Sequence, residues 1–148
     1  MAPLQKRAWI GLGIGLISGL GILLVVLIKG ATNFNDDTAM RLMIDGFWVG
    51  GLALYGLSIG VTRRKRGKKE ILRDERDEAI MARAGQVQIL AIIVSLVIWA
   101  IALTEVYWDD GQIPIVFPYL MFIFTLVVNI IAQALGILLG YWRASLDG

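Results

Sequence analysis

The chain has 148 residues, of which 57% are hydrophobic and 18% are charged, and its mean hydropathy is +0.72. This composition excludes an ordinary soluble domain, in which about a quarter of the residues are charged. Cysteine and histidine are both absent, which excludes disulfides, thiolate or histidine metal sites and serine–histidine triads.

Four apolar stretches follow one another along the chain, and each matches the ~20 residues that a helix needs to cross ~30 Å of hydrocarbon. The predicted helices cover residues 8–29, 42–62, 75–107 (with the membrane part at 86–107) and 113–142. The first stretch is too long for the core of a signal peptide, so we expect it to be retained. The prediction is an all-α, polytopic integral membrane protein, with four transmembrane helices bundled into a single domain over residues 1–148.

Charged residues are divided unevenly between the two sides of this arrangement. Twelve of the fourteen basic residues lie near the N-terminus, in the segment 63–83 or near the C-terminus, whereas Lys29 and Arg41 lie on the other side with half of the acids. Basic residues near helix ends mark the cytoplasmic side. We therefore expect both termini and the segment 63–83 in the cytoplasm, and we expect the protein in a prokaryotic cytoplasmic (inner) membrane.

Glycines recur at four-residue spacing in the first, second and fourth helices. Such ridges let helix backbones approach closely in lipid, and we interpret them as packing positions within the bundle or in a homodimer. A gating helix or a lipid groove is the functional alternative. Two amides on the fourth helix, one turn apart, are expected to hydrogen-bond across helices rather than to orient a ligand. The predicted packing positions are Gly11, Gly15, Gly19, Gly46, Gly50, Gly56, Gly60, Asn129, Gln133, Gly136 and Gly140.

Asp45 and Glu105 are the acids nearest the hydrocarbon, and an ionisable residue at such a position is a functional candidate. Both are expected within one or two turns of the outer surface. Arg41 precedes Asp45 at helical spacing, so we expect an ion pair between them. No acid lies near the middle of any predicted helix, which argues against a proton-coupled transporter.

The segment 63–83 opens with a basic cluster that directly follows the second helix. Juxtamembrane clusters of this kind are topology signals and also attract anionic lipid headgroups. No aromatic residues interleave with the cluster, so direct nucleic-acid binding is not expected. The predicted headgroup contacts are Arg63, Arg64, Lys65, Arg66, Lys68 and Lys69.

The segment continues with Asp74-Glu75-Arg76-Asp77-Glu78, in which Asp74 is a candidate N-cap of the third helix. Acids at positions 74, 77 and 78 share one helical face and could hold a divalent cation. The string has neither a loop glycine nor a regular ligand spacing, so no metal site is predicted. We favour the third interpretation, in which all five residues form a docking surface for a protein partner.

The same string carries a resemblance to a known family. Asp74-Glu75-Arg76-Asp77, followed by Glu-Ala-Ile80 and a small-residue stretch into a membrane helix, resembles an uncharacterised family of small four-helix membrane proteins of archaea and bacteria. The resemblance covers roughly residues 74–142. Members are often encoded beside a helix-turn-helix regulator, so the resemblance implies sequestration or control of such a regulator at the membrane.

The expected function is that of a non-enzymatic accessory or regulatory membrane protein, with membrane lipids and a cytosolic or membrane protein as partners and with no cofactor. The alternative is a small dimeric transporter or channel. An enzyme is not predicted, because Ser18, Ser58 and Ser95 have no histidine or obvious lysine to act as a base.

Overall fold

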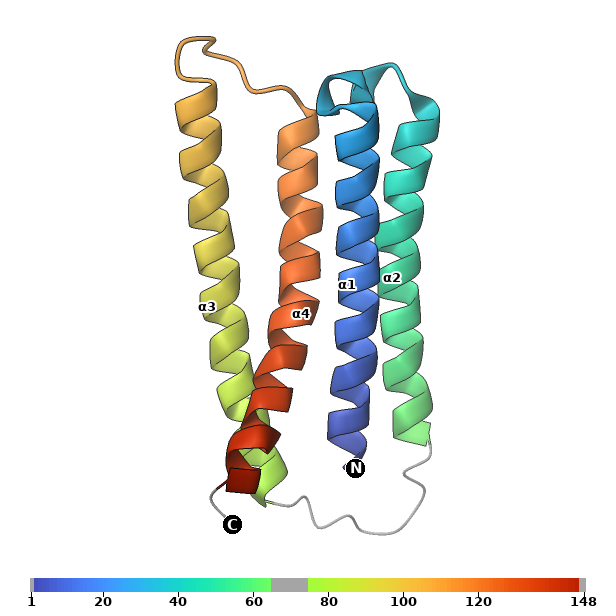
Figure 1. Ribbon diagram of the computed structural model, residues 1–148, viewed down its shortest axis with the longest axis vertical. Coiled ribbons are helices and arrows are strands. Elements are labelled where there is room, and N and C mark those ends of the chain that lie inside the picture. The colour runs from blue at the N-terminus through green and yellow to red at the C-terminus, as the bar shows by residue number, and fades with distance from the viewer. Residues whose placement is uncertain (1, 65–74, 147–148) are drawn as a thin grey trace.

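The computed structural model describes residues 2–64 and 75–146. Its elements are α1 (Pro3–Lys29), the short 3₁₀ helix η1 (Ala31–Asn35), α2 (Thr38–Arg64), α3 (Glu75–Val106) and α4 (Val116–Leu146) (Figure 1). All four α-helices are long and apolar enough to cross a membrane. The prediction of an all-α protein with four such helices is confirmed.

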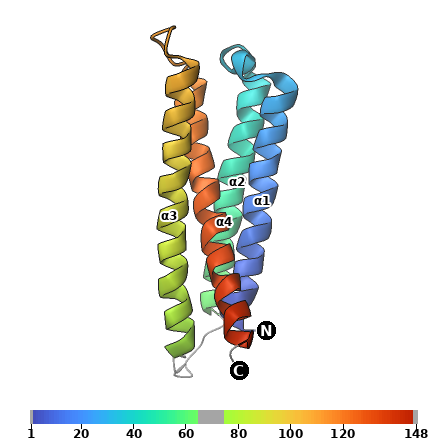
Figure 2. The ribbon, with the colours of Figure 1, turned by 60° about the vertical axis from the view of Figure 1, so that its left-hand side comes forward.

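The helices stand side by side in the order α3, α4, α1, α2 (Figure 1). α4 packs on both α3 and α1, and α1 packs on α2, so α2 and α3 form the two edges of the row. In the apolar 18-residue stretch of α4, 39% of the residues are buried, whereas only 6% are buried in the corresponding stretch of α3. The turned view keeps α3 at one side and α1 with α2 at the other (Figure 2). α4 is therefore the central helix of an open row.

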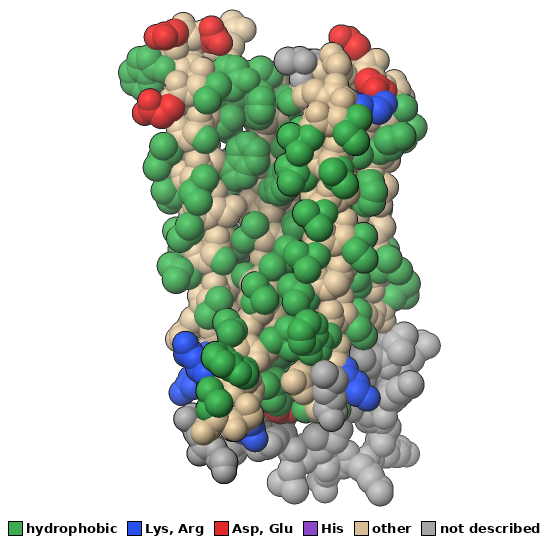
Figure 3. Space-filling view, in the orientation of Figure 1, with side chains coloured by type: hydrophobic (Ala, Val, Ile, Leu, Met, Phe, Trp, Pro, Cys, Tyr) green, Lys and Arg blue, Asp and Glu red, His purple; other side chains and the backbone are tan. Residues whose placement is uncertain are grey.

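Both chain termini lie at one end of the row, which we call the terminal end, and η1 lies at the opposite end, which we call the loop end (Figure 1). In the space-filling view, acidic side chains gather at the loop end, whereas most of the basic side chains lie at the terminal end (Figure 3). Green apolar side chains cover the height between them. The surface thus has the apolar band with charged rims that a membrane-spanning protein requires.

Local sequence explains where α1 begins and ends. Pro3 occupies the first helical turn, where its missing N–H costs nothing. Gly30 ends the helix with a φ of 79°, a conformation that glycine adopts without steric penalty, and its N–H donates to the Val26 carbonyl at 2.9 Å. The Asn33 amide donates to the Lys29 carbonyl at 2.7 Å, which satisfies one of the carbonyls left open at the helix end.

α4 begins at Val116, three residues later than the sequence predicts. Pro114 disfavours helical geometry at Ile113, the residue before it. The Phe117 N–H donates to the Pro114 carbonyl at 3.0 Å, forming a turn that leads into the helix. The apolar run thus starts before the helix does.

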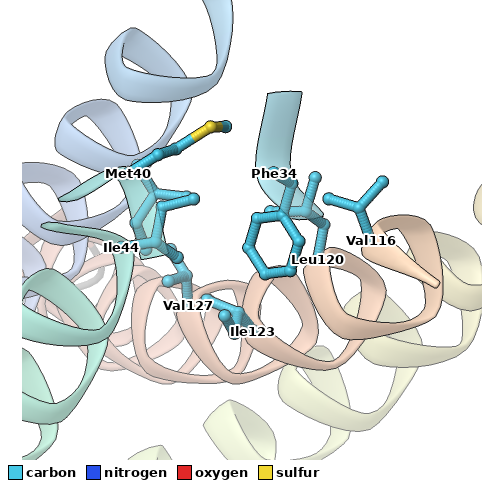
Figure 4. Close-up of a cluster of buried hydrophobic side chains, with 8 residues drawn as sticks. Phe34, Met40, Ile44, Val116, Leu120, Ile123 and Val127 are labelled. Atoms are coloured by element: carbon cyan, nitrogen blue, oxygen red, sulfur yellow. The ribbon is translucent and has the colours of Figure 1, made fainter. Parts of the chain in front are cut away.

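Two clusters of buried side chains join the helices. The smaller one lies toward the terminal end and contains Ala8, Ile80, Ala84 and Ile137. The larger one lies at the loop end, where residues of η1 pack with α1, α2 and α4, and seven of its members are labelled in Figure 4. Its buried residues are Ile22, Phe34, Met40, Ile44, Val116, Leu120, Ile123 and Val127. The larger group of buried side chains therefore lies where the short connection through η1 packs against the row.

Asp37 provides a pH-dependent clamp between α1 and α2. Its carboxylate accepts hydrogen bonds from the Lys29 ammonium at 2.5 Å and from the Met40 N–H at 2.9 Å. The Lys29 hydrogen bond, followed by the one from Met40, lowers the pKa of Asp37 below its ordinary 3.8. A lowered folded-state pKa contributes stability that is present above the ordinary pKa and is lost as the pH falls through the folded-state value.

We therefore expect Asp37→Asn to lower the melting temperature in detergent at neutral pH, because asparagine can still cap α2 but carries no charge for Lys29. The difference from the native chain should shrink as the pH falls from the ordinary pKa of 3.8 through the lowered folded-state pKa, where Asp37 of the native chain also becomes neutral. A difference in melting temperature that stays constant across this range would contradict the clamp.

Candidate interaction surface at the start of α3

Polar side chains along α4 pair with both edge helices. Toward α2, Tyr119 donates to the Asp45 carboxylate, and Gln133 accepts a hydrogen bond of 2.7 Å from the Tyr55 hydroxyl. Toward α3, Asn129 accepts from the Gln88 amide, and Tyr141 donates to the Asp77 carboxylate. Unsatisfied polar groups are costly in hydrocarbon, so each pair favours one register between its helices. α4 therefore fixes both edge helices by hydrogen bonds as well as by packing.

α3 is held to α4 at the terminal end by close contact between small residues. A Cβ built on Gly136 would lie 2.8 Å from the Cα of Ala84, and one built on Gly140 would lie 2.8 Å from the Ile80 side chain. Ile80 and Ala84 are both buried. These contacts, together with the hydrogen bond between Tyr141 and Asp77, attach the first turns of α3 to α4.

The structure describes the side chains of only three of the five residues in the predicted docking surface. Arg76 and Glu78 lie in the first turn of α3 with exposed side chains, whereas Asp77 is half-buried and faces Tyr141. Asp77 thus contacts α4, a role that the sequence alone did not indicate. Asp74, Lys65, Arg66, Lys68 and Lys69 lie outside the described residues, as do the side chains of Arg63, Arg64 and Glu75.

The predicted packing glycines fall into two groups. Those of α1 face another helix: a Cβ built on Gly11 would lie 3.0 Å from the Tyr55 ring, on Gly15 2.7 Å from Ile131, and on Gly19 2.9 Å from Val127. Together with Gly136 and Gly140 on α4, they are the positions where backbones approach closely within the chain.

The glycines of α2 are arranged differently from the expectation of packing within the bundle. Among residues 2–64 and 75–146, a Cβ built on Gly46, Gly50, Gly56 or Gly60 would meet no atom within 4 Å. Gly51, which the four-residue spacing did not select, is the buried glycine of α2 and faces Ser18 of α1. Gly46, Gly56 and Gly60 are exposed and Gly50 is half-buried. Packing in a homodimer, or the alternative of a gating helix or a lipid groove, therefore stays a prediction for them.

The expected ion pair between Arg41 and Asp45 does not form. Arg41 donates instead to the Thr38 hydroxyl at 3.2 Å. Asp45 accepts from Tyr119 and from the Trp48 indole N–H at 3.0 Å, and that N–H also lies 3.2 Å from the Tyr119 hydroxyl. The two donors come from Trp48 of α2 and Tyr119 of α4. The Asp45 carboxylate therefore points toward α4 and not toward Arg41.

These observations define a class: a four-helix protein whose helices are all able to span a membrane. Within residues 2–64 and 75–146, no three acidic side chains come together in a way that could hold a metal ion. The chain matches no known family model, no curated protein and no solved structure. Its function must therefore be argued from its own residues.

Proposed function

We propose that the protein is a non-enzymatic accessory or regulatory membrane protein, and that it binds a protein partner through the start of α3. The attachment of this turn to α4 carries the proposal. Ile80, Ala84 and Asp77 contact α4, and these contacts position the backbone that carries the exposed charged side chains of Arg76 and Glu78. A surface that is ordered before binding loses less conformational entropy when the partner docks.

The orientation and location are part of the same proposal. We infer that the terminal end lies in the cytoplasm of a prokaryotic cell and that the row crosses its inner membrane, because most of the basic residues belong to this end. The basic residues between α2 and α3 would then lie beside the cytoplasmic leaflet and hold the docking surface close to anionic headgroups. The resemblance of the Asp74–Asp77 string makes a helix-turn-helix regulator the first partner to consider.

The test is purification from the native membrane in a gentle detergent, followed by native mass spectrometry. We expect a protein partner at a fixed stoichiometry, and we expect the double variant Arg76→Glu/Glu78→Lys to lose at least about tenfold of it, which corresponds to about 1.4 kcal/mol of binding free energy. The matched control, Asp36→Lys/Arg41→Glu, makes the same charge changes at the loop end and should retain the partner. Equal recovery from both double variants would refute the proposed surface.

A small dimeric transporter or channel is the alternative function. The observation that favours it is the open face of α2, where a Cβ built on Gly46, Gly50, Gly56 or Gly60 meets no atom of the described residues within 4 Å. Small residues on such a face allow close helix–helix contact in lipid. Solute flux into proteoliposomes above the background of empty vesicles, lost on Gly50→Leu, would support this alternative over the partner surface.

A further inference from the structure

A small cavity toward the terminal end is lined by residues of all four α-helices. It has about 10 Å³ of free space, close to the minimum that one water molecule needs. Among the described residues that line it, Arg7 is the charged one, Tyr55 and Gln133 are the polar ones, and the others are apolar or glycine. The cavity therefore combines a positive charge with two hydrogen-bonding side chains in apolar surroundings.

Arg7 is placed differently from its neighbour Lys6, although both contribute to the basic charge of the terminal end. Lys6 is exposed, whereas Arg7 is half-buried and lines the cavity. No acidic side chain within residues 2–64 and 75–146 forms an ion pair with Arg7. Partial burial of a charge is costly unless an opposite charge or hydrogen bonds compensate for it. Within the described part of the chain, Arg7 therefore brings to the cavity a positive charge that no acid neutralises.

Tyr55 orients the Gln133 amide at the same cavity. α1 stands between α2 and α4 in the row (Figure 1), yet the Tyr55 hydroxyl of α2 donates to Oε1 of Gln133 on α4 at 2.7 Å. The ring can pass α1 because position 11 is glycine, where a Cβ would lie 3.0 Å from it. This hydrogen bond leaves the amide nitrogen of Gln133, which can only donate, for another partner. The Arg7 guanidinium also can only donate, so the cavity is richer in donors than in acceptors.

An excess of donors suits an anion, and the small free space suits a small one. A water molecule has the right size, but its two hydrogens need acceptors, whereas an anion needs donors only. A chloride ion is close to water in size, and phosphate and carboxylate groups are larger. We propose that the cavity binds one monatomic anion of the size of chloride between the Arg7 guanidinium and the Gln133 amide, with Tyr55 as the positioning residue. The site does not depend on the proposed partner surface.

Equilibrium binding of radiolabelled chloride to the full chain in a neutral detergent tests the site. We expect saturable binding of one chloride per chain. Arg7→Gln should weaken it by at least about tenfold, the loss expected when a hydrogen bond to a charged group is removed. Lys6→Gln is the matched control, because it removes the same charge from an exposed position one residue away, and it should leave chloride binding nearly unchanged.

Thermal stability supplies a second readout. The melting temperature should rise when chloride replaces gluconate at constant ionic strength, because a ligand that binds only the folded state stabilises it, and Arg7→Gln should abolish this rise. Gln133→Glu keeps an acceptor for Tyr55 and adds a negative charge at the cavity, where it can pair with Arg7. This variant should bind no chloride, and in gluconate it should melt no lower than the native chain.

Three outcomes would overturn the site. The first is no bound chloride and the same melting temperature in chloride and gluconate, which would mean that water fills the cavity. The second is equal loss of chloride binding in Arg7→Gln and Lys6→Gln, which would indicate a response to surface charge alone. The third is undiminished chloride binding by Gln133→Glu, which would place the anion elsewhere on the protein.

Discussion

Gly136→Ala should lower the free energy of unfolding by about 1–3 kcal/mol, the range for adding volume to a close-packed contact. The new Cβ would lie 2.8 Å from the Cα of Ala84 and 3.0 Å from its Cβ. A backbone atom cannot rotate away as a flexible side chain can, so α3 itself must shift. Because α4 is the main packing partner of α3, this shift also weakens the contact between Gly140 and Ile80 and the hydrogen bond between Tyr141 and Asp77.

Helical circular dichroism during titration with sodium dodecyl sulfate measures this loss. Gly46→Ala is the matched control, since a Cβ at Gly46 would meet nothing within 4 Å and alanine is the better helix former. The control should be neutral or slightly stabilising. Equal destabilisation by the two substitutions would mean that α3 and α4 do not pack through Gly136.

Tyr119→Phe should destabilise the loop end by about 1.5–3 kcal/mol, the range for a hydrogen bond to a charged group. The Tyr119 hydroxyl donates to the Asp45 carboxylate and lies 3.2 Å from the Trp48 indole N–H. Phenylalanine keeps the ring that packs at 5.2 Å between centroids on Phe34. The substitution therefore removes the donor and leaves Asp45 with the Trp48 hydrogen bond.

A double-mutant cycle isolates this interaction. In an Asp45→Leu background the carboxylate is gone, so Tyr119→Phe should then cost little. Tyr107→Phe removes a hydroxyl at the same end of the row, from a ring that packs against Phe117 at 5.4 Å between centroids, and it should have a smaller effect. If Tyr119→Phe costs the same with and without Asp45, the two side chains are not coupled.

The sequence was sufficient to predict the four helices, because runs of about 20 apolar residues with few charges are long enough to span hydrocarbon. It did not predict which faces of these helices meet. Glycine spacing identifies a helix face with small side chains, but it does not identify which helix packs on that face. The ridge with Gly46 and Gly50 was therefore indistinguishable from the ridge with Gly11 and Gly15. Of these two ridges, only that of α1 packs closely against other helices in the described part of the chain.

The prediction of an ion pair between Arg41 and Asp45 was wrong for a related reason. Spacing along a helix identifies neighbours on its surface. Tyr119, however, lies 74 residues from Asp45 and approaches it only in the folded row, where α4 packs on α1 and α1 packs on α2. Asp77 is a parallel case at the other end, since its hydrogen-bond donor lies 64 residues away. Both misplacements concern polar residues whose donors come from α4, the helix at the centre of the row.

Covalent capture in living cells tests the docking surface most directly. A photoreactive side chain at position 78, on the exposed start of α3, should form an adduct with one protein partner. The same group at position 43, on an exposed position of α2, should not, and Arg76→Glu should abolish the adduct at position 78. Adducts of this chain with itself or with lipid, and with no partner protein at position 78, would contradict the proposed role.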